Sequence, residues 1–269
     1  MSKRSRMWNE AKYRKYLAEG RGQGTLADYK PWVQIQDFPS KGVVSRVKGR
    51  TTGRVHHLMS NLELRYFYLL DWSEKSADIR EQFPLIEISD AIEIADKCGI
   101  RYPYDNVSGF PYVLTTDFLI TTENGYAARS VKPSSELSRP RVREKLEIER
   151  RYWQARGVDW RIVTENEIPR TKIRNIEWLL SGRDFAEIVA DREKAHDCED
   201  FFINLYCEGD YTVITAIRHV EKTYGLDNGA GMALFKMLIR QKRITVDLNR
   251  QISLTGTGSG DGKWNGTYS

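Results

Sequence analysis

The sequence predicts an α/β fold, a mixed sheet flanked by helices, followed by a mainly helical domain. Two strand-like runs, residues 112–120 and 126–132, are separated by a stretch that contains Asn124-Gly125, and Asn-Gly between such runs is a strong hairpin signal. A helical stretch and another strand-like run come next, and the order strand, helix, strand implies a parallel crossover. After Pro169 the chain changes to successive helical segments.

The N-terminal part has weaker signals. Residues 7–19 predict a short helix, which the glycine-rich residues 19–24 end. Residues 25–55 read as loop because prolines and glycines interrupt them. Residues 60–72 have apolar side chains at helical spacing, and residues 79–88 predict an extended segment.

The crossover itself is clearer. Residues 139–157 predict a helix that ends at Gly157, and residues 158–168 predict the strand that follows it. Four further helical segments are predicted at residues 175–180, 198–209, 213–225 and 231–242.

The end of the chain predicts a small wing. Residues 243–254 look like a two-stranded hairpin after the helices, which suggests a winged-helix-like module. We therefore expect a first domain at residues 1–168 with a basic N-terminal arm and a winged-helix-like domain at residues 169–254. Residues 255–269 are glycine-rich and predict a disordered tail, either native or a linker.

Composition excludes several classes of protein. A hydrophobic content of 40% can build a real core, so the chain is not a disordered protein. No run approaches the ~20 apolar residues that span a bilayer, and the charged N-terminus lacks the apolar stretch of a secretory signal. The cysteines Cys98, Cys198 and Cys207 lack paired metal spacing and fit small core residues in a reducing compartment. These features predict a cytoplasmic protein with no membrane partner.

Positive charge is concentrated at the N-terminus. Residues 1–50 have twelve Lys/Arg against four Asp/Glu, a local +8, so the rest of the chain sums to −3 of the overall +5. This segment is either an arm that contacts phosphates or a solvated helix, and charge alone leaves both open.

The predicted hairpin brings an acid and a lysine together. If Asn124 and Gly125 form the loop, Asp117 lies directly opposite Lys132, and Ser130 shares their face. The pair is either a cross-strand ion pair or a site. Since the apolar residues 118–120 follow Asp117, its carboxylate lies at a buried strand end and needs a metal or a charge partner.

Two glutamates are further candidates. Ser60 and Glu63 have the spacing of a helix capping box, but Glu63 also lies close to His56 and His57 in a basic loop, a plausible DNA-facing edge. Glu149 lies on the same helix face as apolar residues three before and four after it, where a carboxylate is unusual.

Several motifs in a consistent order resemble a known family. They are "EGRGQG", "YKPW", "TGRVHHLMSNLEL", "ADIREQFPL", "TTDFL", "VKP" and "LEIERRYW", over about residues 17–180. Together they resemble the TnsA endonuclease subunits of heteromeric TnsA/TnsB transposases, within the restriction-endonuclease-like PD-(D/E)xK superfamily.

The resemblance implies a restriction-endonuclease-like fold and a metal-dependent DNA endonuclease. Glu63 and Asp117 match metal-binding acids, Lys132 matches the catalytic lysine, and Glu149 matches a further acid needed for cleavage. Ser130 occupies a slot where the family commonly has glutamine and contributes its backbone carbonyl to the metal, so we expect its side chain to be free to vary. The implied cofactor is Mg²⁺, for which Mn²⁺ can substitute.

The resemblance also implies partners and a reaction. Such a nuclease cleaves the 5′ ends of a transposon during cut-and-paste transposition. It acts on DNA with a TnsB-like DDE transposase and a TnsC-like AAA+ regulator, which its C-terminal domain contacts. Two alternatives are a stand-alone restriction or repair nuclease and a non-enzymatic winged-helix module that binds DNA or protein.

Overall fold

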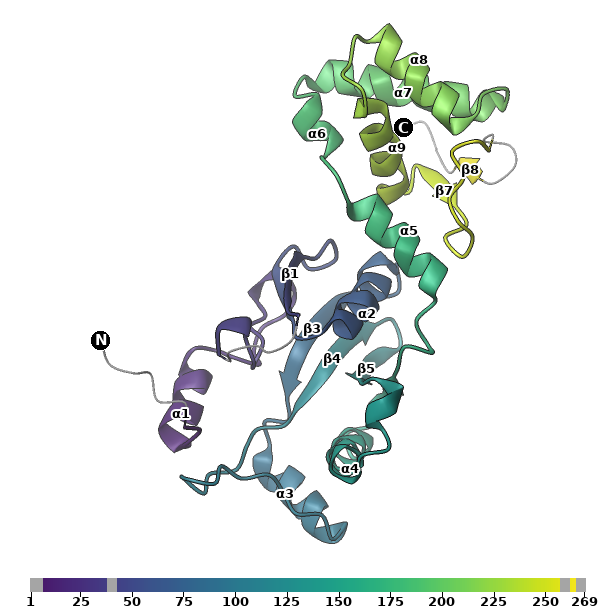
Figure 1. Cartoon of the computed structure of the whole chain (residues 1–269). Helices are drawn as coiled ribbons and strands as arrows, with labels where there is room; N and C mark the ends of the chain where they lie inside the picture. Colours follow the sequence, from purple (N-terminus) through teal and green to yellow (C-terminus); the bar gives the residue numbers. More distant parts are fainter. Residues whose placement is uncertain (1–6, 38–42, 257–261, 265–269) are drawn as a thin grey trace. The chain divides into compact units, whose positions relative to one another are not determined.

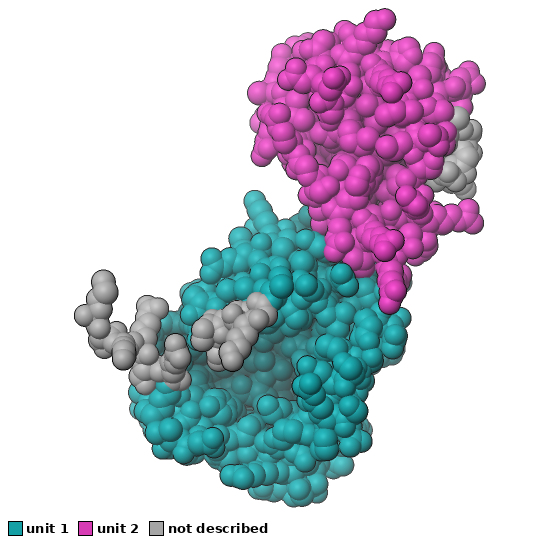
Figure 2. Space-filling model, viewed as in Figure 1, with its two compact units in different colours: residues 1–168 teal, residues 169–269 magenta. Residues whose placement is uncertain are grey.

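The computed structural model describes residues 7–37, 43–256 and 262–264. The chain divides into two compact units, residues 1–168 and residues 169–269 (Figure 2). This boundary falls after Ile168, where the sequence pattern changes. The first residues of the predicted basic arm, 1–6, lie outside the described residues.

The N-terminal unit contains a four-stranded mixed sheet in the order β3-β4-β5-β6 (Figure 1). The β5–β6 pairing is parallel and the other two are antiparallel, which confirms the predicted crossover. The helices and strands of this unit are α1 Glu10–Ala18, β1 Ser45–Lys48, β2 Val55–Leu58, α2 Asn61–Trp72, β3 Asp78–Pro84, α3 Ile88–Lys97, β4 Thr115–Thr122, β5 Gly125–Val131, α4 Pro140–Gln154 and β6 Asp159–Val163, with 3-10 turns η1 Leu26–Asp28, η2 Ile35–Asp37 and η3 Ser134–Glu136.

Helices cover both faces of this sheet. On one face Phe118 of β4 packs against Tyr66 of α2, with ring centroids 5.7 Å apart. The next residue, Leu119, points to the other face and joins a buried cluster with Ala91 of α3 and Ile148 of α4. Because side chains alternate along a strand, β4 contributes to two cores at once. The predicted flanked α/β sheet is confirmed.

The predicted hairpin register is wrong by two positions. Thr122 pairs with Gly125, so Glu123 and Asn124 form the loop, and Gly125, at φ +103°, belongs to β5. The Thr122 hydroxyl donates to the Gly125 carbonyl at 3.0 Å and stabilises this turn. Asp117 therefore continues the ladder opposite Ser130, not opposite Lys132. Since the shift is even, all three stay on one face.

Two elements of the N-terminal unit have no counterpart among the predictions. Strand β1 and the turn of the β1–β2 hairpin lie inside residues 25–55, which read as loop, whereas β2 begins at Val55, and each strand has four residues. Helix α3 starts where the extended prediction for residues 79–88 ends, and no side chain caps its N-terminus. Short strands and an uncapped helix leave little local signal.

The C-terminal unit is mainly helical, as predicted. Its elements are α5 Arg170–Leu180, α6 Phe185–Ile188, α7 Arg192–Glu208, α8 Val213–Thr223, α9 Ala230–Arg240, β7 Ile244–Val246 and β8 Gly262–Trp264. None of the helices in the described part of the chain is long and apolar enough to cross a membrane.

The predicted wing at residues 243–254 is wrong in its second strand. Strand β7 pairs with β8, not with residues 251–254. Asn175 explains the difference, since its amide donates to the carbonyls of Leu248 and Arg250 at 2.8 and 2.6 Å. The Ile214 N–H of helix α8 then binds the Leu254 carbonyl at 2.9 Å. These bonds hold the segment on the helices.

Two smaller predictions also need correction. Residues 262–264 form β8, so the predicted disordered tail at 255–269 is wrong there, and residues 257–261 and 265–269 lie outside the described residues. Of the three cysteines predicted as core residues, Cys198 is buried and Cys207 is exposed.

Candidate active site

Asp117 and Lys132 meet at one end of the sheet. Asp117 is near the start of β4, and Lys132 directly follows β5. The Lys132 ammonium donates to Asp117 Oδ2 at 2.7 Å, and the backbone N–H of Val131 donates to the same oxygen at 2.7 Å. The side chains thus meet diagonally across the ladder. Val131 fixes the carboxylate, and Lys132 approaches it from the strand end.

Asp117 keeps the Lys132 side chain charged. Burial disfavours the ammonium, but the negative charge of Asp117 and its hydrogen bond outweigh this effect and raise the pKa of Lys132 above its ordinary value. Lys132 is therefore a cation at neutral pH. It can stabilise negative charge or orient a polar group, and it is a poor base while this contact persists.

Glu63 is both a helix cap and a member of this cluster. Its N–H donates to Ser60 Oγ at 3.1 Å, while the Ser60 hydroxyl donates to Glu63 Oε1 at 3.0 Å. The Met59 N–H donates to Glu63 Oε2 at 3.0 Å. The two interpretations of Glu63 are therefore compatible, because the capping contacts hold a buried carboxylate next to Asp117.

The carboxyl of Glu63 is electrostatically unfavourable where it lies. Its exposed fraction is 6%. Burial and then the charge of Asp117 raise the pKa of Glu63 to about 7, against the lowering effect of the Met59 hydrogen bond and Lys132. When both acids are ionised, two carboxylates share one lysine, and a further cation would offset the excess negative charge.

Glu149 lies behind this pair, on α4. It is buried on the same helix face as Leu146 and Trp153, which confirms the predicted orientation. The Ser130 hydroxyl donates to Glu149 Oε1, and the Trp160 indole N–H donates to the same oxygen at 3.0 Å. Burial and then the charge of Asp117 raise the pKa of Glu149 to about 7.

The Ser130 side chain is buried and hydrogen-bonded, which was not expected of a side chain free to vary. Its exposed fraction is 1%, and besides donating to Glu149 it accepts a hydrogen bond from the Trp160 indole at 3.2 Å. Loss of this hydroxyl would remove one of the groups that stabilise a fully buried carboxyl. Ser130 thus ties β5 to α4 directly behind Lys132.

His56 does not face DNA, so that prediction is wrong. It is fully buried, with Nδ1 2.8 Å from Glu81 Oε2 and Nε2 2.7 Å from Thr52 Oγ1. His57 points the other way and is half-buried, with Nδ1 accepting from the Ile35 N–H at 3.3 Å. The two rings point apart, as expected of neighbours on an extended segment.

Comparison with known proteins matches both units. Residues 73–165 match the family described as TnsA-like endonuclease N terminal, and residues 167–248 match TnsA endonuclease C terminal. A relative from Escherichia coli, the transposon Tn7 transposition protein TnsA, is 38% identical over 245 residues, 88% of this chain and 86% of the relative. The chain belongs to the TnsA endonuclease family. It is a TnsA-like endonuclease of DNA transposition, and the cluster around Asp117 is its candidate active site.

The acids of this TnsA-like site fit a hard, oxygen-seeking cation. In the described residues, no three His, Cys, Asp or Glu side chains converge as a ready metal site. Glu63 and Asp117 offer carboxylate oxygens, and Mg²⁺ binds with one or two carboxylates while keeping several waters. The raised pKa of Glu63 means that its ionised form is disfavoured in this site, and a bound cation would favour that form.

One residue of the site has no counterpart among the predictions. Gln82 of β3 donates its side-chain amide to Glu63 Oε2 at 3.3 Å. Its backbone has φ +49°, a left-handed conformation that is rare outside glycine. The sequence placed Gln82 in a predicted extended segment and in the motif "ADIREQFPL", and neither reveals the backbone conformation.

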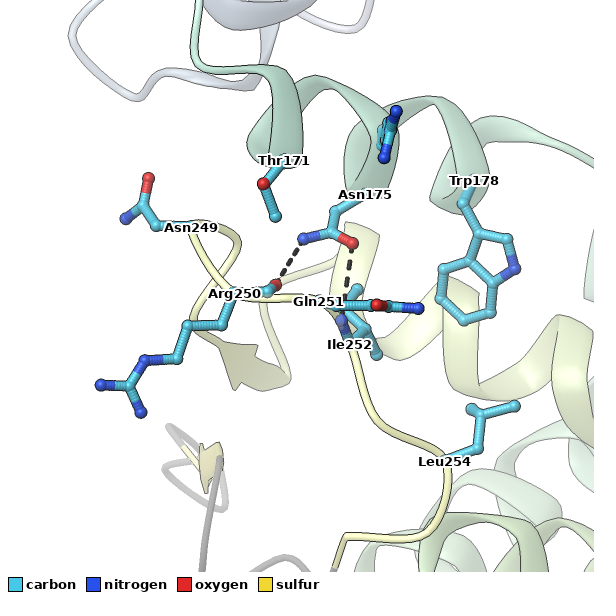
Figure 3. Close-up of a pocket in the computed structure, with 9 residues that line it drawn as sticks. Thr171, Asn175, Trp178, Asn249, Arg250, Gln251, Ile252 and Leu254 are labelled. Atoms are coloured by element: carbon cyan, nitrogen blue, oxygen red, sulfur yellow. Dashed lines mark hydrogen bonds between the residues drawn. The ribbon is translucent and has the colours of Figure 1, made fainter.

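A pocket of about 540 Å³ lies in the C-terminal unit (Figure 3). Asn175 spans it with hydrogen bonds to the segment opposite. None of its lining residues that the structure describes is acidic: Thr171, Arg174, Asn175, Trp178, Asn249, Arg250, Gln251, Ile252 and Leu254. This pocket therefore lacks the carboxylates of the candidate active site.

Proposed function

We propose that this TnsA-like chain is a Mg²⁺-dependent endonuclease that hydrolyses phosphodiester bonds at the 5′ ends of a transposon. The observation behind this proposal is the contact between Asp117 and Lys132 beside the buried, electrostatically strained carboxyl of Glu63. Membership in a family of transposition endonucleases supports the substrate. The proposed place of action is the cytoplasm.

Glu63, Asp117 and the Ser130 carbonyl would hold the Mg²⁺, for which Mn²⁺ can substitute. When bound, the ion supplies polarisation of the phosphoryl group and a lower pKa for the attacking water. Carboxylates and a carbonyl are suitable donors for such an ion. Serine in place of a third carboxylate is then compatible with activity, because the main chain serves as the donor.

The protein's own groups have distinct roles in this proposal. Lys132, held as a cation by Asp117, orients the attacking water or stabilises the negative charge that develops on the phosphate. Val131 fixes Asp117 through its N–H. Glu149 acts through Ser130, since it binds that hydroxyl and so positions the end of β5.

Partners complete the proposed reaction. A TnsB-like DDE transposase would cut and join the 3′ ends, and a TnsC-like AAA+ regulator would contact the C-terminal unit. The support is the family and the relative, which is named as a transposition protein. A nuclease of this kind would be harmful when free, so we expect little cleavage until the partners assemble.

The test compares matched aspartate variants in a Mg²⁺ reaction with transposon-end DNA and both partner proteins. Asp117→Asn and Lys132→Ala should each lower release of the 5′ ends by about a hundredfold or more. The control is Asp159→Asn, which breaks a 2.7 Å ion pair with Arg129 and lies at the start of β6. It should cleave at the wild-type rate.

Other outcomes would contradict the proposal. Wild-type cleavage by both Asp117→Asn and Lys132→Ala would show that the site is elsewhere. Specific cutting of duplex DNA by the chain alone would favour a stand-alone nuclease.

A further inference from the structure

Gln82 has an unusual backbone for a residue inside a strand. Its φ of +49° is one of three positive values at non-glycine residues in the described part of the chain, with Leu26 and Lys242. A side chain disfavours this conformation, because Cβ approaches the following carbonyl. A left-handed strand residue persists only where its surroundings hold it, and such residues cluster at functional sites.

At Gln82 the side chains of β3 stop alternating regularly between the two faces of the sheet. Glu81 contacts His56 on the face covered by α2. Phe83, two residues later, would share that face in a regular strand. Instead its ring lies 5.9 Å from that of Trp153 on α4, on the opposite face. Gln82 is the point at which the alternation changes.

Asp117 lies at the matching point of the neighbouring strand. The register pairs Glu81 with Phe118 and Phe83 with Thr116, so Gln82 and Asp117 face each other between these pairs. The side chain of Thr116 accepts from the Trp153 indole at 2.6 Å, which places it on the α4 face. Both strands therefore change face at the candidate active site.

The N-terminal segment holds Gln82 in place. The Trp32 N–H donates to the Gln82 carbonyl at 3.2 Å, and the Tyr29 hydroxyl donates to the Glu81 carbonyl at 3.0 Å. Gly22 lies so close that an added Cβ would be 2.4 Å from Pro84 Cγ. The glycine-rich residues 19–24 therefore approach β3 closely at Pro84, two residues after Gln82.

The side chain of Gln82 is held at both ends. The Thr115 hydroxyl donates to Gln82 Oε1 at 3.2 Å, and Gln82 Nε2 donates to Glu63 Oε2 at 3.3 Å. Thr115 thereby fixes which end of the amide faces the glutamate, since the oxygen is already used as an acceptor. The buried Gln82 amide therefore directs one N–H at the Glu63 carboxylate, which also accepts the hydrogen bonds that cap helix α2.

We propose that Gln82 is a positioning residue, whose left-handed backbone aims a Thr115-anchored amide at Glu63 and orients that carboxylate for the metal. This inference rests on the proposed function of Glu63. The amide shares Glu63 Oε2 with the Met59 N–H and so restricts rotation of the carboxylate. Groups that orient metal ligands in this way typically change metal affinity or activity by about 10–100-fold when removed.

The experiment measures Mn²⁺ binding to the full chain by calorimetry and the Mg²⁺ dependence of cleavage in the complete reaction. Gln82→Gly permits the left-handed backbone and removes the amide, and Gln82→Asn tolerates that backbone but shortens the amide. Thr115→Val keeps Gln82 and removes only its anchor. The control is Lys242→Gly, which removes a side chain at φ +63° in the C-terminal unit.

We expect both Gln82 variants to bind Mn²⁺ about tenfold or more weakly and to need correspondingly more Mg²⁺ for half-maximal cleavage. Their rate should recover at saturating Mg²⁺, which loss of folding would not allow. Thr115→Val should show a smaller shift in the same direction, and Lys242→Gly should show none.

The inference and the proposed function can fail separately. Wild-type Mn²⁺ affinity in every folded Gln82 and Thr115 variant, with binding lost in Glu63→Gln, would overturn the role of Gln82 alone. Wild-type binding and cleavage by Glu63→Gln would overturn the proposed function and this inference with it.

Discussion

Two groups of buried polar side chains lie next to each other in the N-terminal unit and differ in how the charge of their acids is balanced. Glu81 is fully buried and contacts the Arg54 guanidinium and His56, and it also accepts the His57 N–H at 3.0 Å. The active-site acids instead share Lys132, which contacts Asp117. Adjacent residues of β3, Glu81 and Gln82, belong to the two different groups.

The pKa values of the acids in the two groups are shifted in opposite directions. Burial disfavours the charge of Glu81, but hydrogen bonds from Arg54 and His56 outweigh it and lower its pKa to about 2. Burial and the charge of Asp117 raise the pKa of Glu63 and of Glu149 to about 7. Carboxyls that are all buried thus have pKa values shifted in opposite directions. A carboxylate beside a built-in cation such as Arg54 stabilises the fold, and one without such a partner would be stabilised by a cation from solution.

Breaking the balanced group should give the largest loss of stability. Glu81→Gln leaves the Arg54 guanidinium buried without its charge partner. Removing one partner of a buried pair typically destabilises by about 3–5 kcal/mol. Urea denaturation at pH 7 should show this loss. A change below about 1 kcal/mol would mean that the Arg54–Glu81 pair does not stabilise the fold.

The active-site group should respond in the opposite direction. Glu149→Gln retains the acceptor for Ser130 and Trp160 and removes the buried charge. A pKa raised above its ordinary value means that wild-type stability falls as pH rises from about 4.5 to about 7. In metal-free buffer at pH 8 the variant should therefore be more stable, by up to about 3 kcal/mol.

A measurement of the same two proteins at low pH is the control for this prediction. At pH 4, where the Glu149 carboxyl is protonated in both the folded and unfolded states, the variant and the wild type should have similar stabilities. Lower stability of Glu149→Gln at pH 8 would show that the ionised carboxylate is balanced after all.

The lowered pKa of Glu81 predicts a second pH range, below neutral pH, in which the stability of the protein changes. Because this pKa is lowered, the contribution of Glu81 is fully present above about 4.5 and is lost as pH falls from there towards 2. The shift corresponds to about 3 kcal/mol. Acid unfolding of wild type and Glu81→Gln should therefore converge at low pH. Parallel curves, with a constant difference down to pH 2, would contradict this assignment.

An exposed acid gives the smallest effect. Glu144 pairs with Arg141 at 2.7 Å on the surface of α4, five residues before Glu149. Exposed pairs contribute about 0–1 kcal/mol, so Glu144→Gln should change stability by less than 1 kcal/mol, independently of Mg²⁺. The same urea denaturation measures it. A shift as large as that of Glu81→Gln would remove the contrast between buried and exposed acids.

Local sequence patterns predicted part of this site. Helical spacing placed Glu149 on a buried face, and strand runs with a turn brought Asp117 and Lys132 together. The predicted register was off by two because Asn-Gly favours a loop at residues 124–125. In the structure Thr122 pairs with Gly125, so the loop lies one residue earlier, at residues 123–124. The roles of these acids came from the family resemblance, since a capping box alone explains Glu63 equally well.

The remaining features depend on contacts between distant segments. The balance of Glu81 needs Arg54 and His56, which come from a hairpin too short to be predicted. The left-handed backbone of Gln82 depends on Trp32, fifty residues earlier. Local propensity has no information about such contacts, so a buried acid looks the same in the sequence whether or not it is paired.

Mn²⁺ binding to the full chain, measured by calorimetry, tests the central claim most directly. That claim is that the poorly balanced acids around Asp117 form the cation site of this endonuclease. Wild type and Asp159→Asn should bind alike, and Asp117→Asn should bind at least about tenfold more weakly. Wild-type affinity in Asp117→Asn would contradict the account.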